Sequence, residues 1–478
     1  MAPARAGLST LLDDLAREAR RYDGAMLIPP RIVPPPKPLG RLAFIARFVR
    51  NPLEAIPQAV YEEDFVPLGG ANARTVWVTS PALIRAVLVD QRDKFRKLTQ
   101  IRLLGPLLGK GILTSEGADW KWQRQAASPM FRPAELASFV PMFVRAADDT
   151  LERWRASPQG SVQAVDADMT RATFDVISST LLPSVEAGFG AGVLRATHVL
   201  QRFGGWDILY ASLNVPRWMP RPAGAAKFRA MQHLRASVMS LVRARRAEHA
   251  AGRAPDDLLD RLVLARDPET HAAMDDEQLV DNLLTFYLAG HETTAKALTW
   301  TLYLLARSQE WTARLVDEIE RVTRGAPIAS AHVESLVLVR QVLRESMRLY
   351  PPAPMMSRQA VEDTELDGHR ITRGMSVLIP IYAMHRHARR WENPDAFDPA
   401  RFAPEREGNI PRYQYMPFGA GPRVCIGMSF ALIEATAILA TLLRGARFEM
   451  AAATDPVPLA RVTLVPGGGM PLRVAMKV

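Results

Sequence analysis

The stretch Phe418-Gly-Ala-Gly-Pro-Arg-Val-Cys-Ile-Gly427 holds the only cysteine of the sequence, Cys425. Its three glycines let the backbone turn tightly or approach a flat group closely. A helical apolar pattern then runs from Ile426 to about Leu443, which predicts that the sulfur lies at the N-terminus of a helix. Free N–H groups and the positive end of the helix dipole at that position favour a thiolate over a thiol.

Two interpretations of Cys425 are open from these residues alone. A thiolate ringed by hydrogen-bond donors is the axial ligand that a heme iron accepts. A lone cysteine near a glycine-rich turn is more often a small buried apolar side chain. Because the sequence has no second cysteine, an intrachain disulfide and a multi-cysteine zinc or iron–sulfur site are both excluded.

The composition is that of a folded protein. The 478 residues are 48% hydrophobic and 23% charged, which excludes wholesale disorder, a collagen-like fibre and a multi-span membrane protein. The net charge of +10 comes from arginine, since only 8 of the 60 basic residues are lysine. These arginines are dispersed along the chain and no nucleic-acid motif accompanies them, so we expect no nucleic-acid partner.

The first 40 residues differ in character from the rest. Residues 9–20 carry an apolar helical stripe, which is typical of packing against the protein itself or of lying on a membrane surface. Six prolines between Pro29 and Pro38 then predict a stiff, extended arm. No secretory signal and no run of about 18 apolar residues is present, so we expect a cytoplasmic protein without a transmembrane anchor.

No Gly/Ser linker divides the chain after residues 1–40, and we expect a single domain over residues 41–478. Strand signals are short, at 75–79 and 374–380, so the expected fold class is mainly α with a minor β part. An irregular stretch as long as residues 385–417 is uncommon in a compact domain and usually functional. The predicted helices cover residues 133–155, 164–182, 225–251, 257–265, 275–307 and 333–349.

The motif Ala289-Gly-His-Glu-Thr-Thr294 lies midway along the longest predicted helix. Glycine is a poor helix former by about 1 kcal/mol, and threonines compete for the carbonyl four residues earlier. We therefore expect a distorted turn, where small Ala289 and Gly290 let a flat ring and an oxygen ligand approach. Glu292 and Thr293 would supply an acid and a hydroxyl that pass protons through water. The alternative is a polar kink in a core helix.

Two further motifs pair polar side chains on one helix face. Glu345-Ser-Met-Arg348 places an acid and a base three residues apart, which is commonplace on protein surfaces and contributes little there. In Trp120-Lys-Trp-Gln-Arg124 the indole N–H and the guanidinium, four residues apart, suit one buried carboxylate.

These motifs, in this order and at these separations, resemble those of the cytochrome P450 family of heme-thiolate monooxygenases, in particular its soluble bacterial members. The resemblance runs from about Pro34 to the C-terminus and rests on Phe-x-x-Gly-x-Arg-x-Cys-x-Gly, Ala-Gly-x-Glu-Thr and Glu-x-x-Arg. It implies a cytochrome P450 fold with a single triangular domain that binds heme b (iron protoporphyrin IX). It also implies insertion of one atom of O2 into an organic substrate.

The resemblance also implies roles for single residues. Cys425 would be the axial ligand of the iron, and Phe418 would shield its sulfur. The basic residues and Trp120 would bind the heme propionates, with Lys121 turned to solvent, and the small residues would leave room for the ring. The residues implied to bind the cofactor are Trp120, Arg124, Ala289, Gly290, Arg358, His385, Phe418, Arg423 and Gly427.

Catalysis and structural support are assigned in the same way. Thr293 would steady the activated oxygen, and Glu292 would feed protons from solvent. In the segment Asp398-Pro-Ala-Arg-Phe402, Ala400 stands where the family usually has glutamate, while the arginine and phenylalanine are retained. The implied structural set, a buried group that supports the cysteine loop, consists of Glu345, Arg348 and Arg401.

Few residues bear on the substrate. Pro354, Met355 and Met356 fall where the family turns a strand over the heme, and methionine adapts to irregular apolar ligands. Residues 96–111 are expected to form a lid over the pocket. The leucines at 103, 104, 107 and 108 favour an apolar substrate, although core packing explains them equally well. A fatty acid, a terpenoid and an aromatic compound are not separated by these residues.

The 53 residues after Cys425 are too few for a flavin or iron–sulfur domain, and none lies upstream. Electrons from NAD(P)H would therefore arrive indirectly, through a separate ferredoxin or flavodoxin with its reductase, and the positive charge favours an acidic carrier. We expect a monomer. Two other functions stay open. One is an isomerase or peroxide-using member of the family, against which Glu292 and Thr293 argue, and the other is a heme sensor without catalysis.

Overall fold

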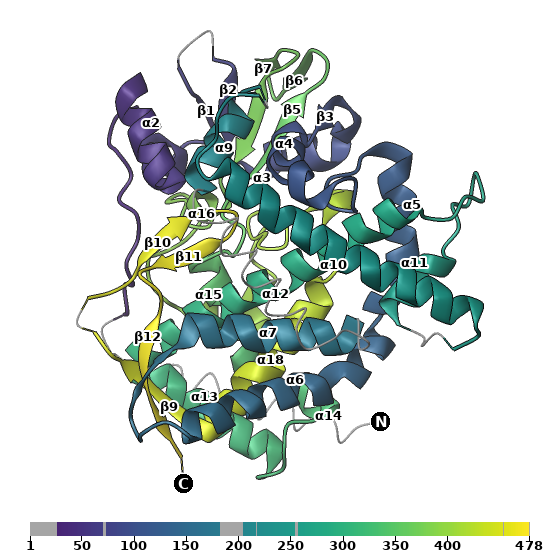
Figure 1. The fold of residues 1–478 in the computed structure, drawn as a ribbon. Helices are drawn as coiled ribbons and strands as arrows, with labels where there is room; N and C mark the ends of the chain where they lie inside the picture. The colour runs from purple at the N-terminus through teal and green to yellow at the C-terminus, as the bar shows by residue number, and fades with distance from the viewer. Residues whose placement is uncertain are drawn as a thin grey trace, which may run out of the picture.

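The computed structural model of the chain describes residues 26–69, 73–181, 204–216, 218–253, 257–452 and 454–477. It is mainly helical with several small sheets, which confirms the expected fold class (Figure 1). The apolar stripe at residues 9–20 lies outside the described residues. The helices are α2 (Arg41–Arg50), α3 (Pro81–Arg85), α4 (Leu98–Leu108), α5 (Gly117–Ala127), α6 (Pro133–Arg155), α7 (Val165–Leu181), α9 (Gly204–Ser212), α10 (Gly224–Ala250), α11 (Leu258–Leu264), α12 (Asp276–Arg307), α13 (Gln309–Thr323), α14 (Ser330–Val333), α15 (Val337–Leu349), α16 (Ile381–Met384), α17 (Pro404–Glu407) and α18 (Met428–Gly445).

Most predicted helices agree with the structure to within two residues, and α6 has the predicted bounds. The exception is α15, which starts at Val337 because the separate helix α14 occupies the residues before it. Glu318 of α13 accounts for this start, since its carboxylate accepts the N–H groups of Leu338 and Val339 at 2.9 and 3.1 Å. These groups have no partner within their own helix.

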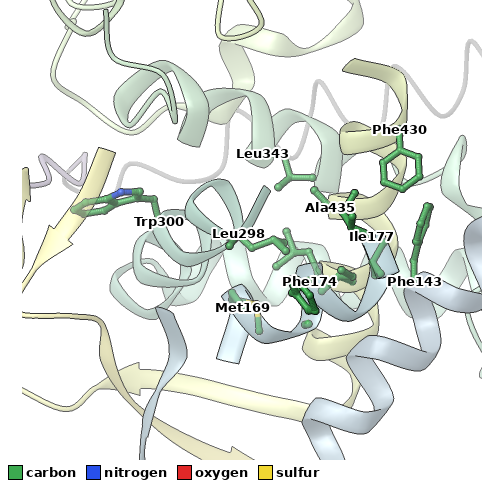
Figure 2. Close-up of a cluster of buried hydrophobic side chains, with 14 of the residues drawn as sticks. Phe143, Met169, Phe174, Ile177, Leu298, Trp300, Leu343, Phe430 and Ala435 are labelled. Atoms are coloured by element: carbon green, nitrogen blue, oxygen red, sulfur yellow. The ribbon is translucent and has the colours of Figure 1, made fainter. Parts of the chain in front are cut away.

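The core is built around α12, which lies in the middle of the molecule (Figure 1). Its 32 residues span about 48 Å and are buried along most of their length. Its first turn is capped by the Asp275 side chain, which accepts the N–H of Gln278 at 2.7 Å. α7 and α18 pack against α12, and α6 packs against both of them. Figure 2 shows the apolar side chains that fill the space between these helices, among them Phe143, Ile177 and Phe430.

Among the described residues, α18 is the one helix long and apolar enough to cross a membrane. Of its length, 61% is buried inside the protein, and α6, α13 and α15 pack against it. In this structure α18 is a core helix, and its apolar residues serve packing.

A five-stranded sheet carries a second, smaller cluster of apolar side chains. Its strands in spatial order are β1 (Phe65–Pro67), β2 (Thr75–Val78), β8 (Ser376–Ile379), β5 (Met356–Ala360) and β3 (Phe95–Arg96). β2 and β8 pair in parallel, and the other neighbours are antiparallel. The two strand signals in the sequence correspond to β2 and β8.

Three smaller sheets complete the described structure. They are β4 (Val162–Ala164) with β12 (Pro471–Met476) and β9 (Ala446–Met450), the hairpin β10 (Val457–Ala460) with β11 (Leu464–Gly467), and the hairpin β6 (Thr364–Leu366) with β7 (His369–Ile371). The β10–β11 hairpin reaches the core, because the indole N–H of Trp300 on α12 donates to the Leu464 carbonyl at 3.0 Å. Its turn therefore lies near the middle of α12.

Candidate active site

The cysteine loop, residues 418–427, closes on itself ahead of α18. The Cys425 N–H donates to the Phe418 carbonyl at 2.9 Å, and α18 begins at Met428. Gly421 has a φ of +71°, and a Cβ at this position would lie 2.7 Å from the carbonyl oxygen of Leu88. Glycine is required at 421 both by the backbone conformation and by this close approach. The sulfur is thus held just before the first turn of α18.

The Cys425 thiol keeps accessible surface although it lies deep within the protein. Burial raises its pKa, and the Gly427 N–H and the Arg124 guanidinium counteract this only in part. Burial thus opposes the thiolate form that the helix terminus favours. A metal cation in direct contact with the sulfur would favour the thiolate.

The middle turn of α12 also keeps accessible surface. Ala289 is exposed and Thr293 is half-buried, whereas residues 279–287 and 294–306 on either side are buried. The Thr293 hydroxyl donates to the Ala289 carbonyl at 2.8 Å. An open turn on an otherwise buried helix, packed against the helix that follows Cys425, fits a flat group inserted between the two.

Two expectations about this turn need correction. α12 runs unbroken through it, because the threonine hydroxyls bond to the carbonyls of an intact helix instead of interrupting it. The open side of Gly290 faces α7 and not the accessible space, since a Cβ there would lie 2.7 Å from Cδ1 of Ile177. Packing of two helices, and not room for a cofactor, is what excludes a side chain at Gly290.

The side chains of Glu292 and Thr293 point in different directions, as those of consecutive residues on a helix do. Glu292 is buried, and its Oε1 accepts a hydrogen bond from the Thr463 hydroxyl at 2.6 Å. Thr463 is also buried and lies in the turn of the β10–β11 hairpin. The carboxyl is therefore held by the hairpin, while the Thr293 hydroxyl stays on the accessible side of α12.

A basic cluster lies beside the cysteine loop and consists of Lys97, Arg124, Arg358 and Arg423. Arg423 donates to the Glu116 carboxylate at 2.9 Å, and Glu116 is the carboxylate that interacts with this cluster in the described structure. Burial, together with the positive charge of the nearby Arg423, lowers the pKa of Lys97 to about 7. Burial also lowers the pKa values of Arg358 and Arg423 to about 10 each. Such an excess of partly buried positive charge fits a group with two carboxylates.

The tryptophan motif lies on α5 and reaches this cluster. The Arg423 guanidinium stacks 3.8 Å from the centre of the Trp120 ring, and Nη1 of Arg124 donates to the Val424 carbonyl at 2.9 Å. Lys121 is exposed. The motif is thus brought against the cysteine loop, with Arg124 next to the cysteine itself.

Glu345 and Arg348 on α15 are fully buried, unlike a surface pair. Arg348 donates to both carboxylate oxygens of Glu345 at 2.7 Å, and Nε of Arg401 lies 3.5 Å from the same carboxylate. Arg348 also donates to three main-chain carbonyls of the irregular stretch, those of His385, Pro394 and Ala396. The set therefore fastens residues 385–398 to α15, and these residues lead on to the cysteine loop.

His385 belongs to this network and not to the basic cluster. It is fully buried, its Nδ1 lies 3.2 Å from the Arg348 carbonyl, and its Nε2 accepts the Met416 N–H at 3.0 Å. Both ring nitrogens are engaged by main-chain groups, so neither is free for a propionate. The expectation that His385 contacts the cofactor is therefore wrong.

The three residues suggested for the substrate pocket differ in exposure. Pro354 is buried and its carbonyl accepts the Tyr382 N–H at 3.0 Å, so it supports the fold and does not line a pocket. Met355 and Met356 are half-buried. The predicted lid contains α4, whose leucines are half-buried except for the buried Leu108.

Sequence reasoning missed two residues of this site, Lys97 and Thr463. A lysine is rare in this arginine-rich chain, which has only 8 of them, and Lys97 lies within the predicted lid. This rarity was the one feature of the sequence that could have marked Lys97 as a site residue. For Thr463 the sequence offers none, because its partner Glu292 is 171 residues away.

The basic cluster, the accessible sulfur and the open turn of α12 together fit a flat, dianionic, metal-bearing group, which makes this a heme-thiolate protein. Comparison with known families agrees. The cytochrome P450 family model matches residues 35–469, and the chain belongs to the cytochrome P450 family.

Cyclooctatin synthase of Streptomyces melanosporofaciens is 30% identical to the chain over 89% of its length and 91% of that protein. Cyclooctat-9-en-7-ol 5-monooxygenase of the same organism is 31% identical, over 82% of the chain and 84% of that protein. A cytokinin hydroxylase of Arabidopsis thaliana is 31% identical, over 86% of the chain and 80% of that protein. The crystal structure of a cytochrome P450DA heme domain superposes with a TM-score of 0.75 at 27% identity, covering 87% of this chain and 90% of that one.

The protein is thus a cytochrome P450 monooxygenase that uses heme b, with electrons from NAD(P)H delivered through redox partners. The bound heme supplies the activation of O2. In this chain Cys425 would hold the iron, and Arg124, Arg358, Arg423 and Lys97 would receive the propionates. Thr293 presents a hydroxyl to the accessible space, and Glu292 keeps a carboxyl one residue away behind it.

Proposed function

We propose that the protein inserts one oxygen atom from O2 into an apolar small molecule, by hydroxylation or a related oxidation. The observation that carries the proposal is the accessible turn of α12. Its accessible surface is apolar at Leu288 and Ala289, and Thr293 adds a hydroxyl to it. Substrate recognition at such a surface depends on burial of apolar area, with few polar contacts.

The name of one relative supports the same class of substrate. That monooxygenase is named after cyclooctat-9-en-7-ol, an unsaturated alcohol, and this type of molecule has an apolar body with one polar group. Half-buried Met355 and Met356 and the leucines of α4 suit a body of this kind, since methionine adapts to irregular shapes. We therefore propose a substrate with at most one polar end.

We further propose that a separate ferredoxin or flavodoxin supplies the electrons to a monomeric enzyme in the cytoplasm. The net charge of +10 supports an acidic carrier, because opposite charges accelerate association at low salt. Turnover with a surrogate acidic ferredoxin and its reductase should fall several-fold as salt rises from low to physiological ionic strength. Unchanged turnover would argue against steering by charge, and cell fractionation tests the location.

The substrate proposal is tested by screening a compound library against the purified, heme-loaded protein. Compounds that displace the water from the heme shift its main absorption band, and hits should be apolar molecules with at most one polar end. Each hit is then incubated with NAD(P)H, ferredoxin and reductase, and an oxygenated product is sought by mass spectrometry. Cys425→Ala is the control, because it removes the only thiol of the chain and should abolish product.

Three results would contradict the proposal. Hits confined to highly charged or sugar-like compounds would overturn the apolar substrate. Binding without any oxygenated product, with an active redox chain present, would favour a heme sensor, and isomerised product without O2 consumption would favour an isomerase.

A further inference from the structure

We infer that Thr463 is a positioning residue for Glu292: its hydroxyl fixes the carboxyl that delivers protons to the oxygen-binding turn of α12. The inference rests on the proposed monooxygenase function and adds to it a residue from a distant hairpin. Thr463 is assigned no contact with the heme or with the reacting atoms.

The contact between the two side chains is short and buried. The Thr463 hydroxyl donates to Oε1 of Glu292 at 2.6 Å, and the two residues are 4% and 6% exposed. A hydroxyl has one proton to donate, and this one is committed to the carboxyl. The bond therefore holds the carboxyl of Glu292 in one direction.

The hairpin that carries Thr463 is itself fixed on both strands. The Asn51 side chain donates to the Pro458 carbonyl at 2.9 Å and accepts the Ala460 N–H at 3.1 Å on β10. On β11, the Leu464 N–H donates to the Pro352 carbonyl at 2.9 Å, and Trp300 of α12 donates to the Leu464 carbonyl at 3.0 Å. The position of the Thr463 hydroxyl is therefore determined by the fold before any substrate binds, as a positioning role requires.

Among the neighbours of Glu292 on α12, the buried His291 interacts with it electrostatically, whereas the other polar side chains are bonded elsewhere. The Thr293 hydroxyl bonds to the Ala289 carbonyl, and the Thr294 hydroxyl lies 3.3 Å from the Gly290 carbonyl and also interacts with the Glu434 side chain on α18. Lys296, one turn later, has its ammonium 3.3 Å from the Thr170 hydroxyl on α7. Loss of the Thr463 hydroxyl would leave the buried carboxyl to find a new orientation.

The test is the variant Thr463→Val, which removes the hydroxyl at nearly constant volume. Product formation should fall about tenfold, because the hydrogen bond that orients the Glu292 carboxyl is lost. The solvent isotope effect on turnover should rise, while heme content and substrate affinity stay within about twofold of the parent. Thr463→Ser keeps the hydroxyl and should restore product formation. Thr301→Val is the matched control, since the buried Thr301 hydroxyl bonds to the Ala297 carbonyl of its own helix and its loss should leave turnover unchanged.

A double-mutant cycle decides whether Thr463 acts through Glu292. In a Glu292→Gln background, Thr463→Val should cause less than about twofold further loss. An additive tenfold loss, or a change confined to substrate affinity, would overturn the inference and make Thr463 a substrate contact. If the parent forms product and Thr463→Val forms as much, only the inference fails. If the parent forms no product with any bound compound, the proposed function fails first and the inference with it.

Discussion

The Nε2 atom of His385 accepts the Met416 N–H at 3.0 Å, two residues ahead of the cysteine loop. On the other side of the ring, Nδ1 lies 3.2 Å from the carbonyl of Arg348, so one imidazole joins α15 to the entrance of the loop. Only the neutral ring with its proton on Nδ1 satisfies both partners. Burial, together with the positive charge of Arg348, lowers the pKa of His385 from 6.5 to about 3.

This lowered pKa predicts loss of stability in acid. Between pH 6.5 and about 3 the unfolded chain binds a proton on this ring that the folded chain does not, so the free energy of unfolding falls as the pH falls. The slope from one such group is about 1.4 kcal/mol per pH unit. His387, with its pKa lowered to about 4 by burial, adds a slope of the same sign.

The variant His385→Gln isolates the contribution of this ring. Urea unfolding of the heme-loaded protein, followed between pH 5 and 7, should depend on pH less steeply than in the parent, by up to about 1.4 kcal/mol per unit below pH 6.5. An identical pH dependence in parent and variant would mean that His385 is not held neutral by this packing.

Removal of Arg348 should be far more damaging than removal of a surface arginine. In Arg348→Ala the fully buried Glu345 carboxylate loses its two 2.7 Å bonds, and three carbonyls lose their donor. We expect a loss of about 3–5 kcal/mol and little soluble, heme-loaded protein. Arg370→Ala is the control, because Arg370 pairs with Asp363 at the surface with 79% of its side chain exposed, and it should cost under about 1 kcal/mol. Heme content per chain and thermal unfolding are measured for both, and a fully loaded, stable Arg348→Ala would disprove the structural role.

Lys97 is predicted to slow the release of heme from the protein. Its ammonium is buried beside Arg358 and Arg423 and donates to the Leu113 carbonyl at 2.6 Å, so an anionic group in the cluster relieves the repulsion between these cations. Lys97→Met should release heme to an excess of a heme-scavenging protein about tenfold faster, as expected for a lost charged hydrogen bond. Lys94→Met, at a residue whose ammonium lies 3.7 Å from the exposed Glu362, provides the comparison. Equal release rates for the two variants would place Lys97 outside the cofactor site.

The features that the sequence predicts well are those encoded over short distances along the chain. The bounds of α6, the loop around Cys425 and the pairing of Glu345 with Arg348 depend on neighbours within one or two helical turns. The roles of His385 and Gly290 are misjudged from sequence because they depend on packing: His385 meets Met416, 31 residues later, and Gly290 meets Ile177 on another helix. A sequence motif gives the identity of these residues, but it does not tell which neighbours their side chains contact.

The last prediction concerns the hydroxyl that remains on the accessible side of α12. Thr293→Ala removes a hydroxyl that bonds to the Ala289 carbonyl at 2.8 Å, and it leaves the helix backbone and the packing at Gly290 intact. Heme content and substrate affinity should therefore stay near the parent values. Without this hydroxyl the accessible turn has no side-chain group that holds a proton, so product formed per NAD(P)H should fall several-fold and hydrogen peroxide should rise in its place.

Thr293→Ser provides the matched control, since it keeps the hydroxyl and should retain most of the coupling between NAD(P)H and product. The comparison with Glu292→Gln separates two roles. Because the Glu292 carboxyl is buried behind the turn against Thr463, its loss should slow turnover more than it diverts electrons into peroxide. Product and peroxide are measured together, per NAD(P)H consumed, with a surrogate ferredoxin and reductase. Unchanged coupling in Thr293→Ala would show that the hydroxyl serves only its own helix, or that the substrate supplies a hydroxyl in its place.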